Sequence, residues 1–199
     1  MWQNYRVEIE YITELLGTQP QGGAREFLEV REDEAIYEGE EVQSRPKTTF
    51  YTHDGFLCLM DYQVKGWLKD AFAELPWLLG ISGRKSEWAS SRVIKGRIDK
   101  WLFVSPRHIS FGKAQPDGQL PRILTAVGPR GPRVTPVESD YVAAGTRAAF
   151  CVEVLKRCPI TIDMLKTALK YGEKYGMLQW RNAGHGCFKV ISLVEEKPN

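Results

Sequence analysis

The sequence lacks the long hydrophobic runs and export signals that would place it in a membrane or outside the cell. No apolar run approaches the roughly 20 residues needed to cross a bilayer. The N-terminus has no charged start followed by an apolar core, as a signal peptide would have. Of the 199 residues, 43% are hydrophobic and 26% charged, which is typical of a globular domain with a core of its own. We therefore expect a cytoplasmic protein with no membrane partner.

Cysteine and histidine are sparse. The four cysteines form no C-x-x-C pair, which argues against a zinc ribbon and favours reduced, buried thiols. The three histidines, His53, His108 and His185, lie far apart in the chain and can meet only through the fold, as a metal site or a general base. No H-E-x-x-H, G-x-S-x-G or Walker motif supports such chemistry. We therefore expect no metal and no other cofactor, and ordinary hydrogen-bonded histidines.

Charge of either sign is nearly balanced overall but unevenly distributed. The chain has 27 Lys and Arg against 25 Asp and Glu, a net charge of +2. Residues 1–41 contain 3 basic and 11 acidic residues, a net −8, whereas residues 84–147 contain 12 basic and 5 acidic residues, a net +7. Two opposed blocks of this size predict one face that binds a polyanion and another that repels it or docks a neighbour.

Hydrophobic patterning predicts an α+β fold. Apolar residues that alternate from Tyr5 to Tyr11 predict a strand, and residues 146–155 and 188–194 predict two more. Apolar residues at three- and four-residue spacing predict a helix over 62–75, with Asp61 as its N-cap. A second helix is expected between the last two strands, ending at Gly176. A right-handed strand–helix–strand unit would make these two strands parallel.

This order of elements suggests a ferredoxin-like (RNA-recognition-motif-like) core within a single domain spanning residues 1–199. The basic middle of the chain, about 80–136, would then be a large, loop-rich insertion. Within it, residues 111–136 contain five prolines and four glycines, which predicts a long irregular segment. Loops of this length in a compact domain are usually functional or disordered.

Residues 176–188 form the most distinctive stretch, Gly-Met-Leu-Gln-Trp-Arg-Asn-Ala-Gly-His-Gly-Cys-Phe. Gly184 and Gly186 permit positive φ and a close approach of the backbone to a ligand. Trp180 offers a stacking surface, and the guanidinium of Arg181 beside backbone amides suits a phosphate group. The alternative is a tight turn in which Trp180 is buried.

The basic block from Arg84 to Arg147 is the second candidate site. Its cations are interleaved with Trp88, Trp101 and Phe111, a combination that would supply phosphate contacts and stacking faces for a single strand. Solvated loops also carry such charges, but clustering opposite an acidic end favours nucleic-acid binding.

Two stretches, residues 61–69 and 176–190, resemble segments of a known family. The first, Asp-Tyr-Gln-Val-Lys-Gly-Trp-Leu-Lys, is similar to a segment that leads from a strand into a helix with a Lys-Gly-small-Leu-Arg core. The second is similar to a C-terminal glycine-rich loop running into a final strand. In both stretches the chain therefore resembles the repeat-associated mysterious protein (RAMP) superfamily, the RNA-recognition-fold proteins of CRISPR effector and guide-processing systems. The chain departs from that pattern at Met60-Asp61-Tyr62, where the family prefers Pro-Gly-Ser, and at Lys69, where it has Arg. Its size also suits a compact relative carried by a phage.

The leading hypothesis is therefore non-catalytic binding of single-stranded RNA or DNA, as a homo-oligomer or as a subunit of a larger assembly. The predicted contacts are Lys65, Lys69, Arg84, Lys85, Arg92, Lys95, Arg130, Arg133, Trp180, Arg181, Gly184 and Gly186.

Two other functions remain open at this point. The first is a metal-independent endoribonuclease of the guide-processing type, in which His185 or His108 removes the proton of a 2′-OH group. The second is a phage-borne protein-interaction or inhibitor protein, whose acidic block from Glu26 to Glu41 meets a basic partner or another copy of the chain.

Overall fold

A computed structural model describes the fold over residues 1–21, 47–74, 91–128 and 131–196. It is an α+β structure in which nearly all neighbouring strands are antiparallel. In these described ranges, three sheets and three α-helices form around one hydrophobic core. The α+β class expected from the patterning is therefore confirmed.

The main sheet has four strands in the order β12-β1-β11-β7. Its strands are β1 (Trp2–Tyr11), β7 (Leu102–Ser105), β11 (Arg147–Leu155) and β12 (Phe188–Glu196). Every neighbouring pair is antiparallel. Since β1 lies between β11 and β12, those two strands run parallel to each other, as the strand–helix–strand unit predicts.

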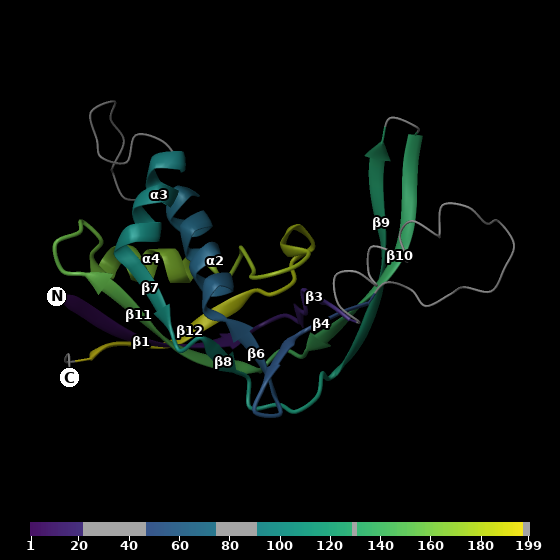
Figure 1. The fold of residues 1–199 in the computed structure, drawn as a ribbon, viewed down its shortest axis with the longest axis horizontal. Coiled ribbons are helices and arrows are strands. Elements are labelled where there is room, and N and C mark those ends of the chain that lie inside the picture. Colours follow the sequence, from purple (N-terminus) through teal and green to yellow (C-terminus); the bar gives the residue numbers. More distant parts are fainter. Residues whose placement is uncertain (22–46, 75–90, 129–130, 197–199) are drawn as a thin grey trace, which may run out of the picture.

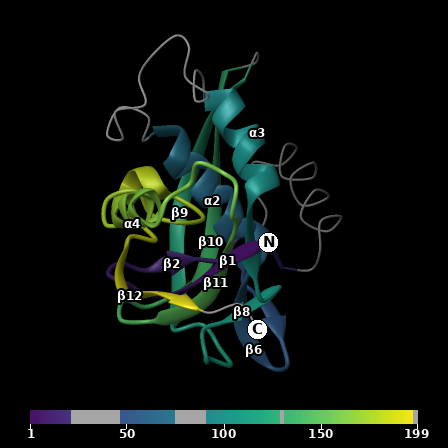
Figure 2. The ribbon, with the colours of Figure 1, turned by 90° about the vertical axis from the view of Figure 1, so that its left-hand side faces the viewer.

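All three helices lie on one side of this sheet (Figure 1). They are α2 (Asp61–Glu74), α3 (Ser91–Trp101) and α4 (Ile162–Tyr171). Figure 2 shows α2 between α4 and α3, and it packs against both. Alternate residues of β1, such as Val7 and Ile9, are fully buried in a core shared with Leu68 and Leu165. The residues that alternate with the buried ones, Arg6 and Glu8 among them, face the opposite side, because successive strand side chains alternate.

The second sheet carries a hairpin that projects from the rest of the described structure (Figure 1). Its strands are β2 (Leu15–Leu16), β3 (Gln19–Pro20), β4 (Lys47–Thr49), β9 (Gly118–Gly128) and β10 (Gly131–Val142). β9 and β10 pair along their whole length as a hairpin. The hairpin rises on the same side of the main sheet as the helices (Figure 1).

A third sheet, in the order β5-β6-β8, leads the chain into α2. Its strands are β5 (Tyr51–His53), β6 (Phe56–Met60) and β8 (His108–Ser110). α2 begins at Asp61, whose carboxylate accepts a hydrogen bond of 2.7 Å from the amide of Tyr62. A carboxylate in the first turn of a helix is stabilised by the helix dipole.

The prediction of an irregular segment over residues 111–136 is wrong, because most of these residues form the hairpin. Proline is tolerated in a strand where its nitrogen faces no neighbour. Pro121 lies in β9, which has β10 as its only partner among the described strands. Pro136 lies in β10 before the point where β4 joins it, at Glu138. Both prolines therefore lie on stretches of strand that have one edge unpaired among the described strands, where a missing donor is tolerated.

One further helix and one helix boundary also differ from the expectation. Residues 91–101, which lie within the expected loop-rich insertion, form α3, which buries Ile94 and Ile98 one turn apart. Helix α4 ends at Tyr171, and its C-cap is Gly172 rather than Gly176. The expected insertion over 80–136 is also too broad, because β7 is an integral strand of the main sheet.

The four cysteines are free of disulfides, and Cys58 and Cys187 are buried. None of the helices in the described ranges has the length and apolar character needed to cross a membrane.

Candidate nucleic-acid interface

The glycine-rich loop between α4 and β12 is joined to the segment that follows β1. The amide of Gly186 donates to the carbonyl of Glu14 at 2.8 Å, and the carbonyl of Gly186 accepts from Met177 at 2.9 Å. Gly186 has a φ of 72°, and a side chain there would collide with the backbone of Met177. Glycine is therefore required at this position for the close approach of two backbone segments.

The loop amides expected to hold a phosphate are used within the protein. Gly184 donates to the carbonyl of Arg181 at 3.0 Å and closes the short 3₁₀ helix η1 (Arg181–Ala183). Gly186 donates to Glu14. In this arrangement, a phosphate group at the loop would meet cationic side chains rather than these amides.

Trp180 lies at the entrance to this 3₁₀ helix and is 37% exposed. The imidazole of His185 stacks on the indole, with ring centroids 5.1 Å apart and planes inclined by 10°. The guanidinium carbon of Arg122 lies 5.6 Å from the centre of the same ring. Trp180 is therefore neither the buried residue of a simple turn nor a free stacking face, but the partly exposed centre of a stacked group.

Arg122 connects the hairpin to the loop. From β9 it donates a hydrogen bond to the side-chain carbonyl of Gln179, whose amide nitrogen donates to the carbonyl of Gly17 at 2.7 Å. Burial lowers the pKa of Arg122, and its Nε is buried without a hydrogen-bond partner. Within the described ranges no carboxylate pairs with this guanidinium. Sequence reasoning missed Arg122, because only the tertiary structure brings β9 next to the loop.

Arg181 and Lys95 come from different elements and meet at one carboxylate. Asp70 of α2 lies 2.7 Å from Nζ of Lys95 on α3 and 3.3 Å from Nη1 of Arg181. Burial alone would raise the pKa of Asp70, but the hydrogen bonds from Lys95 and Arg181 outweigh it and lower the pKa. The guanidinium of Arg181 also lies 4.5 Å above the ring of Tyr175. We call the group formed by Arg122, Trp180, Arg181, His185, Lys95 and Asp70 the loop–hairpin corner.

Lys65 and Lys69, also predicted as contacts, lie closer to the N-terminus of α2 than Asp70 does. Both pair with a second carboxylate. Asp99 of α3 lies 2.8 Å from Nζ of Lys69 and 3.7 Å from Nζ of Lys65. The hydrogen bond from Lys69 lowers the pKa of Asp99. Lys65 also lies 4.3 Å from the ring centre of Phe103 on β7. The structure thus directs both lysines towards Asp99 rather than into the corner.

Not all of the predicted residues belong to the described part of the chain. Arg84, Lys85, Arg130 and the acidic block from Glu26 to Glu41 lie outside the described residues. Arg133 pairs with Ala126 in the hairpin, but its side chain is outside the described part. Arg92 is exposed on the first turn of α3.

The three histidines do not converge. His53 and His108 stack on each other, with ring centroids 3.9 Å apart, in the third sheet. His185 belongs to the corner, where its buried Nδ1 lies 3.8 Å from the carboxylate of Glu14, beyond hydrogen-bond distance. In the described part of the chain, no group of three or more His, Cys, Asp and Glu side chains could hold a metal ion.

The face of the main sheet away from the helices, which we call the open sheet face, has a different character. Glu10 lies at the centre, 2.7 Å from Nζ of Lys189 on β12 and 2.9 Å from Nε of Arg147 on β11. Glu8 lies 3.4 Å from Nη1 of Arg147. The hydrogen bonds from Lys189 and Arg147 lower the pKa of Glu10. Arg147 and Lys189 therefore have carboxylate partners from β1, and Arg6, on the same face, pairs with Glu196 of β12.

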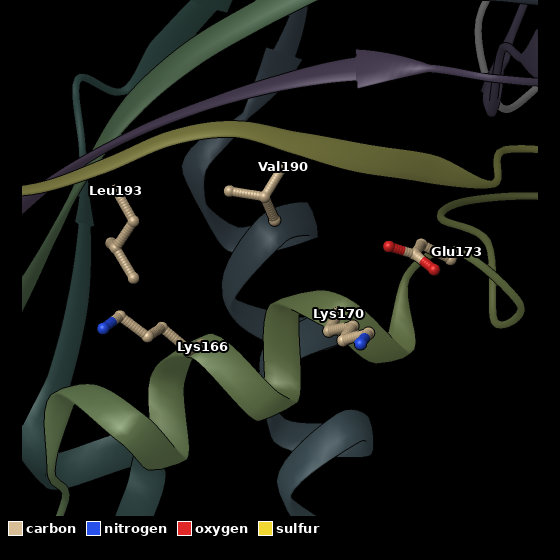
Figure 3. A pocket seen from close by; sticks show the side chains of 5 residues that line it. All are labelled: Lys166, Lys170, Glu173, Val190 and Leu193. Atoms are coloured by element: carbon tan, nitrogen blue, oxygen red, sulfur yellow. The ribbon is translucent and has the colours of Figure 1, made fainter.

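A hollow of about 190 Å³ lies between α4 and β12 (Figure 3). Val190 and Leu193 face it from the strand, and Lys166, Lys170 and Glu173 line it from the helix side. It is open and includes no residue of the corner. Its charged groups stand at the rim and do not converge on one point, so it offers no defined ligand site.

The sequence matches no protein-family model and no curated protein. The fold is similar to one chain of the cryo-EM structure of the Type III-B Cmr-beta bound to cognate target RNA, with a TM-score of 0.52 and 11% sequence identity. The match covers 98% of this chain and 61% of the other. At this level of identity the likeness shows a related fold.

Proposed function

We propose that the protein binds single-stranded nucleic acid, RNA or DNA, at the loop–hairpin corner, as a non-catalytic subunit of a larger assembly. Two neighbouring groups carry this proposal: Arg181 and Lys95 meet at Asp70, and Arg122 lies beside the partly exposed indole of Trp180, the residue next to Arg181. Cations bind the phosphate backbone of a single strand, and aromatic rings stack with its bases whatever their sequence. A surface that combines both is suited to such a ligand.

We further propose that the chain is a relative of the RAMP superfamily with a ferredoxin-like core. In chain order the strands of the main sheet are β1, β7, β11 and β12. Their spatial order is thus fourth, first, third, second, the order of a ferredoxin-like sheet. α2 and α3 connect the first two strands, and α4 connects the last two, as in a split βαβ arrangement.

The similar solved structure supports the choice of ligand and the role as a subunit. Its description names a complex bound to target RNA. Because this chain corresponds to 61% of that chain's length, we carry over only the class of ligand and the membership in an assembly, not an activity.

Binding of fluorescently labelled single-stranded RNA and DNA, followed by anisotropy, tests the proposal. Phosphate contacts release counterions, so we expect affinity to fall steeply between about 50 and 200 mM salt. The double variant R122Q/R181Q should weaken binding at least about tenfold, because two charge-assisted contacts are lost. The matched control R147Q, with one cation removed from the open sheet face, should bind as wild type does. Binding that ignores salt, or none at about 50 mM, would contradict the proposal.

A further inference from the structure

Asp70 connects the two cations of the corner that come from α3 and from the loop. One carboxylate oxygen lies 2.7 Å from Nζ of Lys95, and the other lies 3.3 Å from Nη1 of Arg181. Each oxygen therefore holds one cation, and both cations lie beside the same carboxylate. Building on the proposed function, we infer that Lys95 and Arg181 form one subsite for a backbone phosphate and that Asp70 positions them.

The cations retain donors for such a phosphate. An ammonium group has three N–H donors and a guanidinium five, and Asp70 uses one of each. The side chain of Lys95 is 44% exposed and that of Arg181 30%. Their remaining donors therefore lie close enough to solvent to reach a ligand that arrives from outside.

Asp70 favours binding by restricting these side chains before the ligand arrives. Free lysine and arginine side chains lose much rotamer freedom when they are fixed on a phosphate. Here the carboxylate fixes both, and Tyr175 supports the guanidinium of Arg181 from one side. The side chains of Lys95 and Arg181 are thus already ordered in the unbound protein, as in other preorganised sites.

The alternative role for Asp70 is competition, in which an acidic group near a polyanion only repels it. The two roles predict opposite signs. Removal of the negative charge of Asp70 strengthens binding if the residue competes, and it weakens binding if the residue positions Lys95 and Arg181.

The chain provides a matched control in Asp99. It also lies between α2 and α3, also has a lowered pKa and also pairs with two cations, Lys65 and Lys69. Neither of those lysines belongs to the loop–hairpin corner. The variant D99N therefore removes the same charge from the same pair of helices without disturbing the subsite.

The experiment measures the affinity of wild type, D70N, D70E and D99N for a labelled single-stranded RNA across a salt series. We expect D70N to bind about fivefold more weakly, with a salt slope reduced by about 0.7, the value for one lost phosphate contact. D70E should restore most of the affinity, since it retains the carboxylate. D99N should bind as well as wild type or slightly more tightly, because only a negative charge is lost.

Equal or tighter binding by D70N, in parallel with D99N, would overturn the inference and leave the proposed function intact. Failure of wild type to bind any single strand at low salt would overturn both. Thermal unfolding checks that each variant is folded. If D70N does not fold, the variants K95Q, R181Q and K95Q/R181Q take its place. A shared phosphate predicts that the double variant loses less than the two single losses combined, and independent, additive losses would overturn the inference.

Discussion

The open sheet face and the loop–hairpin corner both carry arginine and lysine, yet they use these cations differently. On the open sheet face, Arg147 lies between Glu8 and Glu10, and Lys189 pairs with Glu10. At the corner, Asp70 serves two cations, and Arg122 pairs with no carboxylate in the described part of the chain. Two cations of the corner also lie beside aromatic rings, Arg122 beside Trp180 and Arg181 beside Tyr175.

If the proposed function holds, this difference explains why a nucleic acid would bind at the loop–hairpin corner and not on the open sheet face. Exposed ion pairs contribute little to stability, but they cancel the local positive potential that a phosphate backbone needs. The face that lacks helices is thus not automatically the binding face of this fold. The candidate interface is marked by an excess of cations over their carboxylate partners, and not simply by the presence of cations.

The largest effect expected from breaking the corner alone is that of Gly186→Ala. A methyl group at a φ of 72° would be strained, and it would collide with the backbone of Met177. We expect a loss of roughly 2–4 kcal/mol of unfolding free energy and loss of nucleic-acid binding. Gly184→Ala is the control, since its φ is 84° but the space around it is open. That variant should lose only about 1–2 kcal/mol, as chemical denaturation would show. Equal losses in the two variants would contradict this account of the loop.

The next effect separates the aromatic residues of the two regions. On β7, Phe103 alternates with the buried Leu102 and Val104 and therefore faces the open side of the main sheet. Trp180 of the corner and Phe103 are exposed to a similar extent, 37% and 40%. Trp180→Ala should weaken binding of a single strand by about 1 kcal/mol, roughly fivefold, through lost stacking. Phe103→Ala should leave the affinity unchanged. The same anisotropy assay measures both, and a loss of affinity in Phe103→Ala would move the interface to the other side of the sheet.

A smaller effect comes from making the open sheet face resemble the corner. The double variant E8Q/E10Q removes the carboxylate partners of Arg147 and Lys189. We expect a gain in non-specific affinity for single strands of about two- to threefold at low salt, which disappears as the salt concentration rises. Should the variant bind no better than wild type at any salt concentration, charge neutralisation would not be what keeps this face from binding.

The smallest effect is a dependence of stability on pH. In the folded state the pKa of Asp70 lies below its ordinary value of 3.8. Its interaction with Lys95 and Arg181 therefore stabilises the protein above that value and is lost as the pH falls through the lower, folded-state pKa. We expect the stability advantage of wild type over D70N, measured by urea unfolding, to be constant above about pH 5 and to shrink below about pH 4. An advantage that grows on acidification would contradict the ion pairing of Asp70.

The parts of the fold that the sequence predicted are those with strong periodicity. β1, β11 and β12 follow from alternation, and α2 and α4 from three- and four-residue spacing, because each buries one continuous face. The hairpin β9–β10 was missed because its prolines and glycines are typical of loops, and only pairing between the two strands makes them compatible with a ladder. α3 was missed because its buried face rests on few residues, Ile94 and Ile98 among them, within a polar segment.

The candidate site was predicted only in part, for a related reason. Trp180, Arg181 and Gly186 stand in one short, unusual segment and are visible in the sequence. Arg122 and Asp70 are not, since they lie 58 and 111 residues from Trp180 and Arg181. Their importance depends on contacts between elements that no local pattern records.

The sequence by itself thus determined the α+β class, the periodic elements and the presence of a cationic, glycine-rich loop, because these depend on neighbouring residues. Only the tertiary structure decided which cations are neutralised and which are available. Whether a charge is available depends on the residues brought beside it through space, and strand pairing and helix packing, rather than order along the chain, determine that neighbourhood.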